Sequence, residues 1–388
     1  MNSSKLQEIM ERKATIIKNP EIFEIDQTPD ELVERRETSV LFEEVAIFLK
    51  YRSVHNLLLT GHPGTGKTVT ANSIQEQIPK FSDEINSFLV NCKDLTPNEV
   101  LYNLNPTMPK NLSFNDAMFY FLKSLEKDTL VFLDEIDKGR NMGDLLYKLS
   151  RPKEICKDCD KKINLVLISN NPVWEDVLDA YIRSSLQLTR VIFSPYNKKD
   201  LIRIMKKRIS KGFMDPAAIS EEQLEKIADF VAEQRTGDSR VAILALKYSA
   251  RLAERRLKDK IEEEDIQKAI TESIRDIESF RIVSLSNQDL FALYSCFTTN
   301  PNLDALYDTC NNIAREITEN KVKLPSKSTF FRELLYLETQ GLIRKEIVVN
   351  TEGKTPHKET VIRPNVDKGI VDNEINLRIG KISENKRS

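Results

Sequence analysis

The sequence lacks any long hydrophobic run and carries almost no net charge. No apolar stretch approaches the ~20 residues that a membrane-spanning helix needs, and residues 1–10 are polar and charged, unlike a signal peptide. We therefore expect no membrane segment and a soluble, cytoplasmic protein. Because 58 Lys and Arg against 60 Asp and Glu give a net charge of −2, any nucleic-acid-binding surface has to be a local basic patch.

Cysteine and histidine are also scarce. The three histidines, His55, His62 and His357, form no pair at zinc-motif spacing, so the C-x-x-C pair of Cys156 and Cys159 lacks two ligands for a zinc site. An odd, scattered set of cysteines favours a reducing compartment over a disulfide framework. The sequence assigns the C-x-x-C pair no role. The full set is Cys92, Cys156, Cys159, Cys296 and Cys310.

A glycine-rich loop directly follows a short apolar run. Residues 56–68 read Asn-Leu-Leu-Leu-Thr-Gly-His-Pro-Gly-Thr-Gly-Lys-Thr, with the G-x-x-x-x-G-K-T spacing of a phosphate-binding loop. Glycine backbones let consecutive N–H groups turn inward around an anion, and the following helix directs its positive end there. A glycine-rich turn without a ligand is the alternative, which the full spacing disfavours. The predicted ATP- or ADP-binding residues are Gly61, His62, Pro63, Gly64, Thr65, Gly66, Lys67 and Thr68.

Two residues of this loop and a second motif predict a magnesium-dependent site. Lys67 is expected to reach the β- and γ-phosphates, and Thr68 to bind Mg²⁺. The apolar run at 130–133 predicts a buried strand that ends in Asp134-Glu135. This pair resembles a Walker B motif, in which Asp134 holds Mg²⁺ and Glu135 polarises the attacking water. Two solvated acids at a strand end are the alternative.

Further strands alternate with helices along residues 1–196. Polar residues follow the strands, which predicts a parallel α/β sheet with its ligand at that edge. Asn170 is a candidate sensor of the γ-phosphate, and a turn-forming Asn before a proline is the alternative. Residues 95–112 are rich in Pro and Asn, which predicts irregular structure. The expected strands include 86–91, 129–134, 164–169 and 191–193, and the expected helices lie at 40–50, at 68 to about 77 and from Ser113.

From Lys198 to about Ile277 the strand signal disappears. Apolar residues such as Leu224, Ile227, Ala228 and Val231 recur at helical spacing, which predicts a small helical lid. Gly237-Asp238-Ser239-Arg240 begins a helix rich in Ala and Leu. Arg240 is a candidate contact to the nucleotide phosphates, with a solvated residue of the first turn as the alternative.

The C-terminal part changes character again, near residues 281–286. Three helices are expected, from Ser286, at 303–317 and at 328–340, followed by strands at 342–349 and 359–363. This order predicts a winged helix. The predicted domains are an ATPase core with an N-terminal arm at 1–196, a lid at 197–281, and a winged-helix domain with a C-terminal tail at 282–388.

The third helix and the wing carry a basic patch. Residues 321–363 hold nine Lys or Arg and five Asp or Glu, a local excess that is typical of DNA contact. Thr329, Arg332 and Tyr336 are expected on one outward face of the helix. A winged helix that docks protein is the alternative, because a fold does not determine function. The predicted DNA-binding residues are Lys327, Thr329, Arg332, Tyr336, Arg344, Lys354 and Lys358.

In their order from Pro29 to about Asn365, the motifs resemble the archaeal replication initiators of the origin-recognition and cell-division-control type. Members of that family are AAA+ ATPases with a C-terminal winged helix. The matching segments are Pro-Asp-Glu-Leu at 29–32 with Arg35, the loop at 61–68, Val-Asn-Cys at 90–92, Asp-Glu-Ile-Asp at 134–137, Leu-Leu-Tyr at 145–147, Ile-Ser-Asn at 168–170, Ser-Ser-Leu at 184–186, Phe-Ser-Pro-Tyr at 193–196 and Gly-Asp-Ser-Arg at 237–240.

The resemblance implies roles for individual residues. Asn170 is then the first sensor, Arg240 the second sensor and Arg35 a nucleotide contact. Residues 95–112 correspond to the insertion that helps to grip DNA, although here the segment is short and poor in basic residues. Family members often carry an arginine where this chain has Tyr181, so Arg183 is the substitute candidate for the arginine finger.

The resulting hypothesis is an ATP-dependent initiator that binds duplex origin DNA and supports loading of the replicative helicase. Slow ATP hydrolysis would act as its switch, paralogous initiators are further expected partners, and association with the nucleoid is expected. One alternative is an AAA+ DNA motor of the branch-migration type, which would form closed hexamers and turn over quickly. Another is a clamp-loader-like or transposition ATPase whose winged helix docks protein.

Overall fold

The computed structural model describes residues 16–297, 303–318, 326–350 and 357–384, which form two compact units. We call Glu21–Lys211 with Gly237–Ser239 the core unit. The C-terminal unit comprises the described residues of Met1–Pro20, Gly212–Thr236 and Arg240–Ser388. No helix within the described ranges is long and apolar enough to pass through a bilayer.

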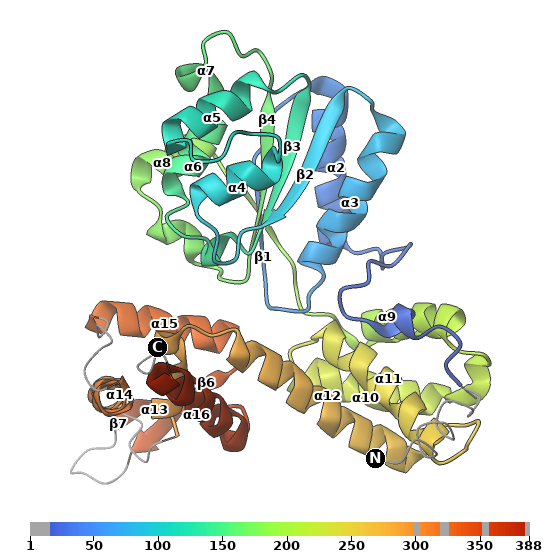
Figure 1. Cartoon of the computed structure of the whole chain (residues 1–388). Helices are drawn as coiled ribbons and strands as arrows, with labels where there is room; N and C mark the ends of the chain where they lie inside the picture. The colour runs from blue at the N-terminus through green and yellow to red at the C-terminus, as the bar shows by residue number, and fades with distance from the viewer. Residues whose placement is uncertain (1–15, 298–302, 319–325, 351–356, 385–388) are drawn as a thin grey trace. The chain divides into compact units, whose positions relative to one another are not determined.

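The core unit is built on a five-stranded parallel sheet with the strand order β2-β3-β4-β1-β5 (Figure 1). The expected parallel α/β sheet is confirmed. Because every strand runs in the same direction, the residues that follow β1, β3 and β4 meet at one edge. The strands are β1 (Leu57–Thr60), β2 (Ile85–Asn91), β3 (Asp128–Asp134), β4 (Ile163–Ser169) and β5 (Thr189–Ile192).

Side chains that alternate along the strands supply two hydrophobic cores, one on each face of the sheet. Leu57 and Leu59 pack with helices α2 (Arg36–Tyr51) and α3 (Lys67–Phe81), whereas Leu58 packs on the opposite face. Burial on both faces explains why the three inner strands β1, β3 and β4 contain continuous apolar runs. The second face is covered by α4 (Pro97–Leu104), α5 (Phe114–Lys123), α6 (Gly143–Ser150) and α8 (Ala180–Leu186) (Figure 1).

The core unit contains one further long helix, α9, and several short helices. Helix α9 (Lys198–Gly212) runs to the end of the unit, and its Lys207 pairs with Glu31 at 3.2 Å, which ties it to the segment before α2. The others are η1 (Pro20–Phe23), η2 (Ile136–Lys138), α7 (Pro152–Ile155) and η3 (Trp174–Val177).

The expectation of irregular structure across 95–112 is wrong, because helix α4 lies within it. Thr96 caps this helix: its side chain accepts from the backbone N–H of Glu99, and the Glu99 carboxylate accepts from the backbone of Thr96 at 2.7 Å. Pro97 occupies the first helical turn, where a missing N–H costs nothing. The capping sequence Thr-Pro-Asn-Glu was therefore a readable helix signal.

Cys156 and Cys159 form a disulfide, contrary to the expectation of unpaired cysteines. The two residues enclose a tight turn after α7, in which the N–H of Cys159 donates to the carbonyl of Cys156 at 3.0 Å. This turn brings the two side chains together. Cys92, Cys296 and Cys310 are free and buried.

The predicted helical lid is confirmed as the first part of the C-terminal unit. Its helices are α10 (Glu221–Gln234), α11 (Ser239–Arg255) and α12 (Glu263–Val283), with the short turn η4 (Pro216–Ala218) before them. The periodic residues Leu224, Ile227, Ala228 and Val231 are all buried, as the helical spacing predicts. Glu254 of α11 accepts from the backbone N–H groups of Ile16 and Ile17 at 2.9 Å, which fastens the N-terminal segment to this unit.

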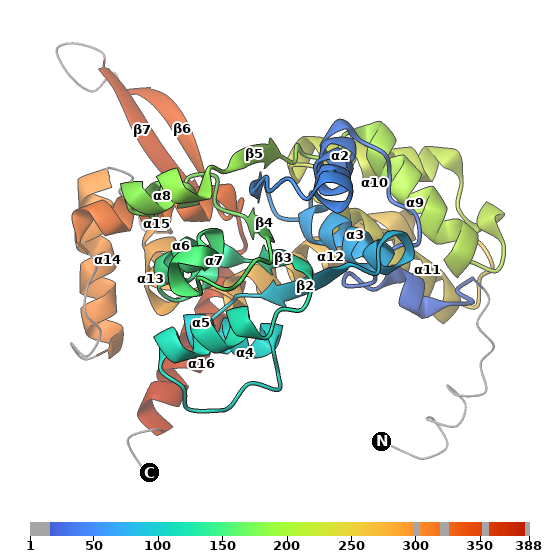
Figure 2. The same ribbon diagram turned by 90° about the horizontal axis from the view of Figure 1, so that it is seen from above.

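The second part of the C-terminal unit has the element order expected for a winged helix. Helices α13 (Asn287–Ser295), α14 (Leu303–Thr318) and α15 (Lys327–Thr339) precede the antiparallel strands β6 (Ile343–Asn350) and β7 (His357–Pro364), which extend away from the helices (Figure 2). Phe330, Leu334 and Leu337 of α15 are buried against α13 and α14.

The expected C-terminal tail is in fact a helix, α16 (Lys368–Glu384). Its buried residues Val371 and Ile375 are spaced four apart and join the core of α13–α15. Arg378 on the same helix donates to the carbonyls of Leu285 and Val283. Ile370 is buried as well, whereas Leu377 of the same helix is 61% exposed, so the apolar residues do not follow a single helical stripe and the sequence did not reveal the helix.

Helix α12 joins the lid to the winged-helix part as one continuous element. Its last turn carries Ile282, which is buried among the C-terminal apolar residues. In the same turn, Arg281 donates to the carbonyl of Gln340, the residue after α15, at 3.0 Å. One turn earlier, Glu278 pairs at 2.9 Å with Arg235 at the end of the lid helix α10. Burial raises the pKa of Glu278, while Arg235 acts in the opposite direction. These contacts fix the lid to the winged-helix part within the unit.

The carboxyl group of Glu333 on α15 predicts a pH-dependent stability. Burial and the nearby charge of Asp289 raise the pKa of Glu333 to about 7, and one carboxyl oxygen has no hydrogen-bond partner in the described residues. The pKa of Glu333 is higher in the folded chain than in the unfolded chain. Its contribution to the free energy of unfolding is therefore most favourable at a pH low enough to protonate the group in both the folded and the unfolded chain. It is lost as the pH rises through the folded pKa.

Glu333→Gln should remove this dependence, because glutamine resembles the protonated acid. The difference in melting temperature between Glu333→Gln and the wild type should increase from about pH 5 to about pH 8, measured by thermal unfolding. Glu338→Gln, on the same helix but paired with Lys345, is the control. A constant difference across this range would contradict the assignment.

Candidate nucleotide-binding site

The glycine-rich loop connects β1 to α3 and encloses the ammonium group of Lys67. Lys67 Nζ donates to the carbonyls of Gly61 and His62 at 2.7 and 2.9 Å, and the residue is only 4% exposed. Thr65 closes the loop by donating its hydroxyl to the carbonyl of His62 at 2.8 Å. A buried cation inside a ring of backbone groups at a helix start is suited to binding phosphate.

Two glycines of the loop are required by close neighbours as well as by backbone conformation. Gly64 and Gly66 have φ angles of 78° and 91°, which residues with a Cβ rarely adopt. A Cβ on Gly64 would lie 1.8 Å from Asp238 Oδ1, and one on Gly66 would lie 2.3 Å from Tyr196 Oη. The loop therefore has steric contacts to two distant segments of the core unit.

The segment Gly237–Ser239, which belongs to the core unit, holds the loop by hydrogen bonds. The hydroxyl and the backbone N–H of Ser239 donate to the carbonyl of Gly64 at 2.8 and 3.2 Å. Asp238 beside it is fully buried. The sequence singled out this segment for Arg240 and missed Asp238 and Ser239, although both lie in the Gly-Asp-Ser-Arg motif.

Thr68 and Asp134 bring the loop and the end of β3 together. The Thr68 hydroxyl donates to Asp134 Oδ2 at 2.8 Å. Burial raises the pKa of Asp134, while the hydrogen bonds from Thr68 and from the N–H of Glu135 act against this. A hydroxyl and a buried carboxylate at one point are the hard oxygen donors that Mg²⁺ prefers, so these residues fit the predicted ion.

Glu135 has an unusual backbone conformation and two side-chain partners. Its φ of 49° lies in the left-handed region, which turns the chain sharply after β3. Lys138 Nζ lies 3.1 Å from Oε1, and Asn91 Nδ2 donates to Oε2 at 3.4 Å. The sequence missed Asn91 and Lys138 as neighbours of Glu135, although Asn91 lies in the matching segment Val-Asn-Cys.

Arg35 lies against the loop and contacts its backbone. Its guanidinium donates to the carbonyls of Thr65 and Ser194 at 3.3 and 2.5 Å, pairs with Glu37 at 3.0 Å, and lies over the ring of Tyr196 at 4.3 Å. These contacts make Arg35 a support of the loop. Direct contact with a nucleotide stays a prediction.

The structure brings one of the remaining predicted site residues to the same edge. Asn170 directly follows Ser169, the last residue of β4, which is in register with Thr60 of β1, so it lies at the same sheet edge as Asp134, the last residue of β3. Arg240 belongs to the C-terminal unit, where it is the second residue of α11. Arg183 lies on α8 and pairs with Asp176 at 3.5 Å, in the helical layer beside the sheet.

The predicted DNA-binding residues lie on α15 and the wing. Lys327 and Arg332 are exposed, and Arg332 donates to the Thr329 hydroxyl at 3.3 Å, which places both on one face. Tyr336 was expected on that outward face, but its ring is half-buried against the C-terminal core. The exposed Arg344 pairs with Glu346 at 3.0 Å. Lys354 and the side chain of Lys358 lie outside the described residues.

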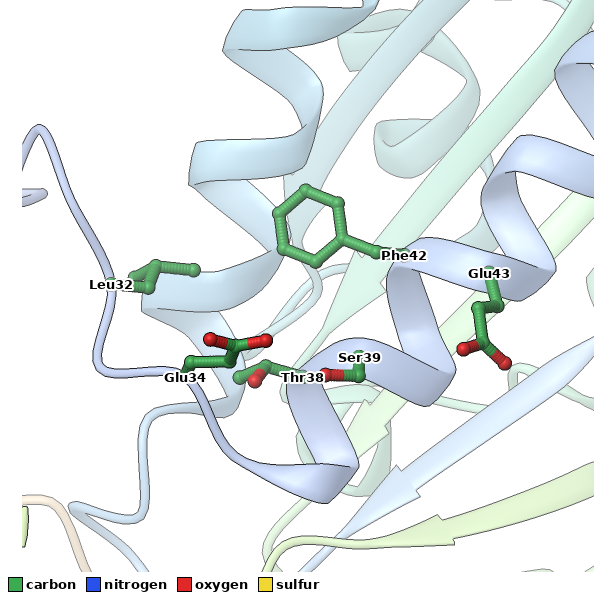
Figure 3. A pocket seen from close by; sticks show the side chains of 6 residues that line it. All are labelled: Leu32, Glu34, Thr38, Ser39, Phe42 and Glu43. Carbon is green, nitrogen blue, oxygen red and sulfur yellow. The ribbon is translucent and has the colours of Figure 1, made fainter.

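A separate hollow of about 390 Å³ lies beside the start of α2 (Figure 3). It contains the carboxylates of Glu34 and Glu43, which would repel phosphate groups. The nucleotide phosphates are therefore assigned to the glycine-rich loop and not to this hollow. Its lining residues are Leu32, Glu34, Thr38, Ser39, Phe42 and Glu43.

Comparisons with known proteins agree with these features. A family model described as "ATPase family associated with various cellular activities (AAA)" matches residues 57–196, and one described as "Cdc6 AAA+ ATPase-type lid domain" matches residues 202–271. The chain is 30% identical over 304 residues to an ORC1-type DNA replication protein of Archaeoglobus fulgidus, covering 74% of this chain and 73% of that protein.

A second relative and a solved structure cover nearly the whole chain. An ORC1-type DNA replication protein of Methanothermobacter thermautotrophicus is 26% identical over 371 residues, which cover 94% of this chain and 98% of that protein. The Aeropyrum pernix ORC1 protein, solved in complex with DNA, has a TM-score of 0.67 at 23% identity and covers 94% of this chain and 97% of that one. The structural likeness shows a common fold.

Replacement of Thr68 tests whether its hydroxyl serves a metal ion. Thr68→Val keeps the shape but removes the donor to Asp134, so the gain in ATP affinity on adding Mg²⁺ should fall by at least about tenfold. Thr68→Ser should retain it. Nucleotide titrations with Mg²⁺ and with a chelator separate the affinity for ATP alone from the gain in affinity that Mg²⁺ provides. An unchanged gain in Thr68→Val would contradict the metal assignment.

Proposed function

Because this chain belongs to the family of ORC1-type DNA replication proteins, we propose that ATP bound at the glycine-rich loop switches its binding to duplex origin DNA. The chain is a replication initiator with a nucleotide-binding AAA+ core. The proposal concerns magnesium, hydrolysis and the DNA contacts.

The observation that carries the nucleotide part is the meeting of Lys67, Thr68 and Asp134 at one sheet edge. The Lys67 ammonium is directed into the loop, where it would neutralise phosphate charge. Thr68 and Asp134 would hold Mg²⁺, which, when bound, neutralises further phosphate charge and orients the phosphates. Glu135 would accept a proton from the attacking water.

A switch needs a link between the phosphates and the lid. Ser239 is hydrogen-bonded to the loop at Gly64 and is also the first residue of α11, so a displacement of the loop acts on the start of that helix. Arg240, the next residue, would contact the phosphates as the second sensor. Asn170, beyond the end of β4, would act as the first sensor.

Arg332 and Lys327, on the exposed part of α15, support the DNA assignment. In a winged helix the third helix enters the major groove and the wing contacts the backbone. The protein related by fold from Aeropyrum pernix was solved with DNA, and we propose the same ligand class here. Loading of the replicative helicase and assembly with paralogous initiators are further parts of the proposal.

A switch must stay in one state for long, so we propose ATP turnover well below the ~10 s⁻¹ median of enzymes. A motor of the branch-migration type would instead hydrolyse ATP quickly on DNA as a closed ring. Membership of the initiator family argues against that alternative. It also argues against a clamp-loader-like or transposition ATPase with a protein-docking winged helix.

Two substitutions should separate nucleotide binding from hydrolysis. Lys67→Ala should lower ATP affinity by more than about tenfold, because it removes the cation that contacts phosphate, whereas Glu135→Gln should bind ATP normally and lose hydrolysis. Lys80→Ala, an exposed lysine at the end of the same helix α3, is the control. Fluorescent-nucleotide titration and phosphate release measure the two effects, and equal binding defects in both variants would contradict the assigned roles.

Substitutions on the helix and on the wing should separate reading of bases from contact with phosphates. Arg332→Ala should weaken binding to an origin duplex by about 1–3 kcal/mol more than to a random duplex, because an arginine can make two hydrogen bonds to guanine. Arg344→Ala should weaken both duplexes alike and reduce the salt slope by about one.

The measurement is binding of each variant to both duplexes across a salt series. Lys226→Ala on the lid helix α10, where Lys226 pairs with Glu263, is the control. If neither Arg332→Ala nor Arg344→Ala changes DNA affinity, the winged helix is not the reader and the protein-docking alternative gains support.

A further inference from the structure

Both carboxylate oxygens of Glu135 are engaged by neighbouring side chains. Oε1 lies 3.1 Å from the ammonium of Lys138, and Oε2 accepts from Asn91 at 3.4 Å. The Lys138 and Glu135 side chains are only 18% and 22% exposed, so water competes weakly for this ion pair. The contact from the charged ammonium at 3.1 Å is stronger than the hydrogen bond from the neutral Asn91 amide at 3.4 Å. Lys138 is therefore the main restraint on the carboxylate.

We propose that Lys138 is a positioning residue that holds Glu135 away from the attacking water and thereby keeps ATP hydrolysis slow. This inference rests on the proposed role of Glu135 and adds a physical cause for the slow switch. Nothing in the Gly-x-x-x-x-Gly-Lys-Thr or Asp-Glu motifs requires a lysine at this position.

The local backbone keeps Lys138 beside Glu135. The N–H of Lys138 donates to the carbonyl of Glu135 at 2.9 Å and closes the single turn η2. Ile136 within this turn is fully buried, and the carbonyl of Lys138 accepts from the N–H of Asp94 at 3.2 Å. Because the turn is fixed at both ends, the ion pair can open only by rotation of the two side chains.

The chemical step explains why this contact matters. The oxygen of water forms a bond to the γ-phosphorus, the bond from that phosphorus to the β–γ bridging oxygen breaks to leave ADP, and the proton of water passes to Glu135. A general base must lie within hydrogen-bond reach of that water. The Lys138 ammonium lowers the basicity of the carboxylate and holds it in one orientation, so proton transfer from the water is favoured when this ion pair opens.

Lys138→Met keeps the length of the side chain and removes its charge. Under single-turnover conditions we expect hydrolysis to be roughly three- to tenfold faster. This factor in rate corresponds to the free energy that a partly exposed ion pair can add to the activation barrier. The ATP dissociation constant, measured with a fluorescent analogue, should stay unchanged, because Lys138 does not contact the glycine-rich loop. Lys138→Arg should keep the slow rate of the wild type.

Matched variants separate this effect from a general disturbance of the core unit. Lys123→Met removes a different ion pair of that unit, between Lys123 and Asp158, and should leave the rate unchanged. Glu135→Gln combined with Lys138→Met should be as inactive as Glu135→Gln alone. Lys138→Gln supplies a second uncharged variant if thermal unfolding shows that Lys138→Met is destabilised.

The outcomes distinguish this inference from the proposed function. An unchanged or slower rate in both uncharged variants, with normal ATP affinity, would overturn the role of Lys138. So would acceleration that persists when Glu135 is also replaced. A wild-type protein that binds no ATP, or a Glu135→Gln variant with normal hydrolysis, would instead overturn the proposed function.

Discussion

The burial of two opposite charges at one sheet edge is the constraint on which the nucleotide site depends. Lys67 and Asp134 are each 4% exposed, and a buried charge is costly unless it is paired or hydrogen-bonded. Loop carbonyls surround the ammonium, and the Thr68 hydroxyl contacts the carboxylate. The parallel sheet meets this constraint because it places the ends of β1 and β3 at the same edge, on either side of β4.

The glycine-rich loop is packed closely against other segments of the core unit. Gly64 and Gly66 have no space for a Cβ beside Asp238 and Tyr196, so the loop cannot shift without moving these neighbours. Ser239 extends this contact into α11. From Arg240 on, helix α11 belongs to the same unit as α12 and α15.

Each of the two units contains one side-chain contact that bears on the proposed switch. Lys138 restrains the carboxylate of Glu135 in the core unit, whereas Arg281 at the end of α12 donates to the carbonyl of Gln340 after α15 in the C-terminal unit. The first pair is proposed to set how long ATP persists. The second contact joins the lid to α15 within that unit.

The parallel sheet, the glycine-rich loop and the Asp134-Glu135 pair could be predicted from the sequence, because each depends on short-range spacing and on burial of continuous strands. Three other features became visible only in the folded chain: the contact of Lys138 with Glu135, the hydrogen bonds from Ser239 to Gly64, and the packing of α16 on the C-terminal core. These contacts join side chains through turns or across large sequence separations. The strength of these contacts depends on the distances between the groups and on their removal from water, and neither can be predicted from the neighbouring residues in the sequence.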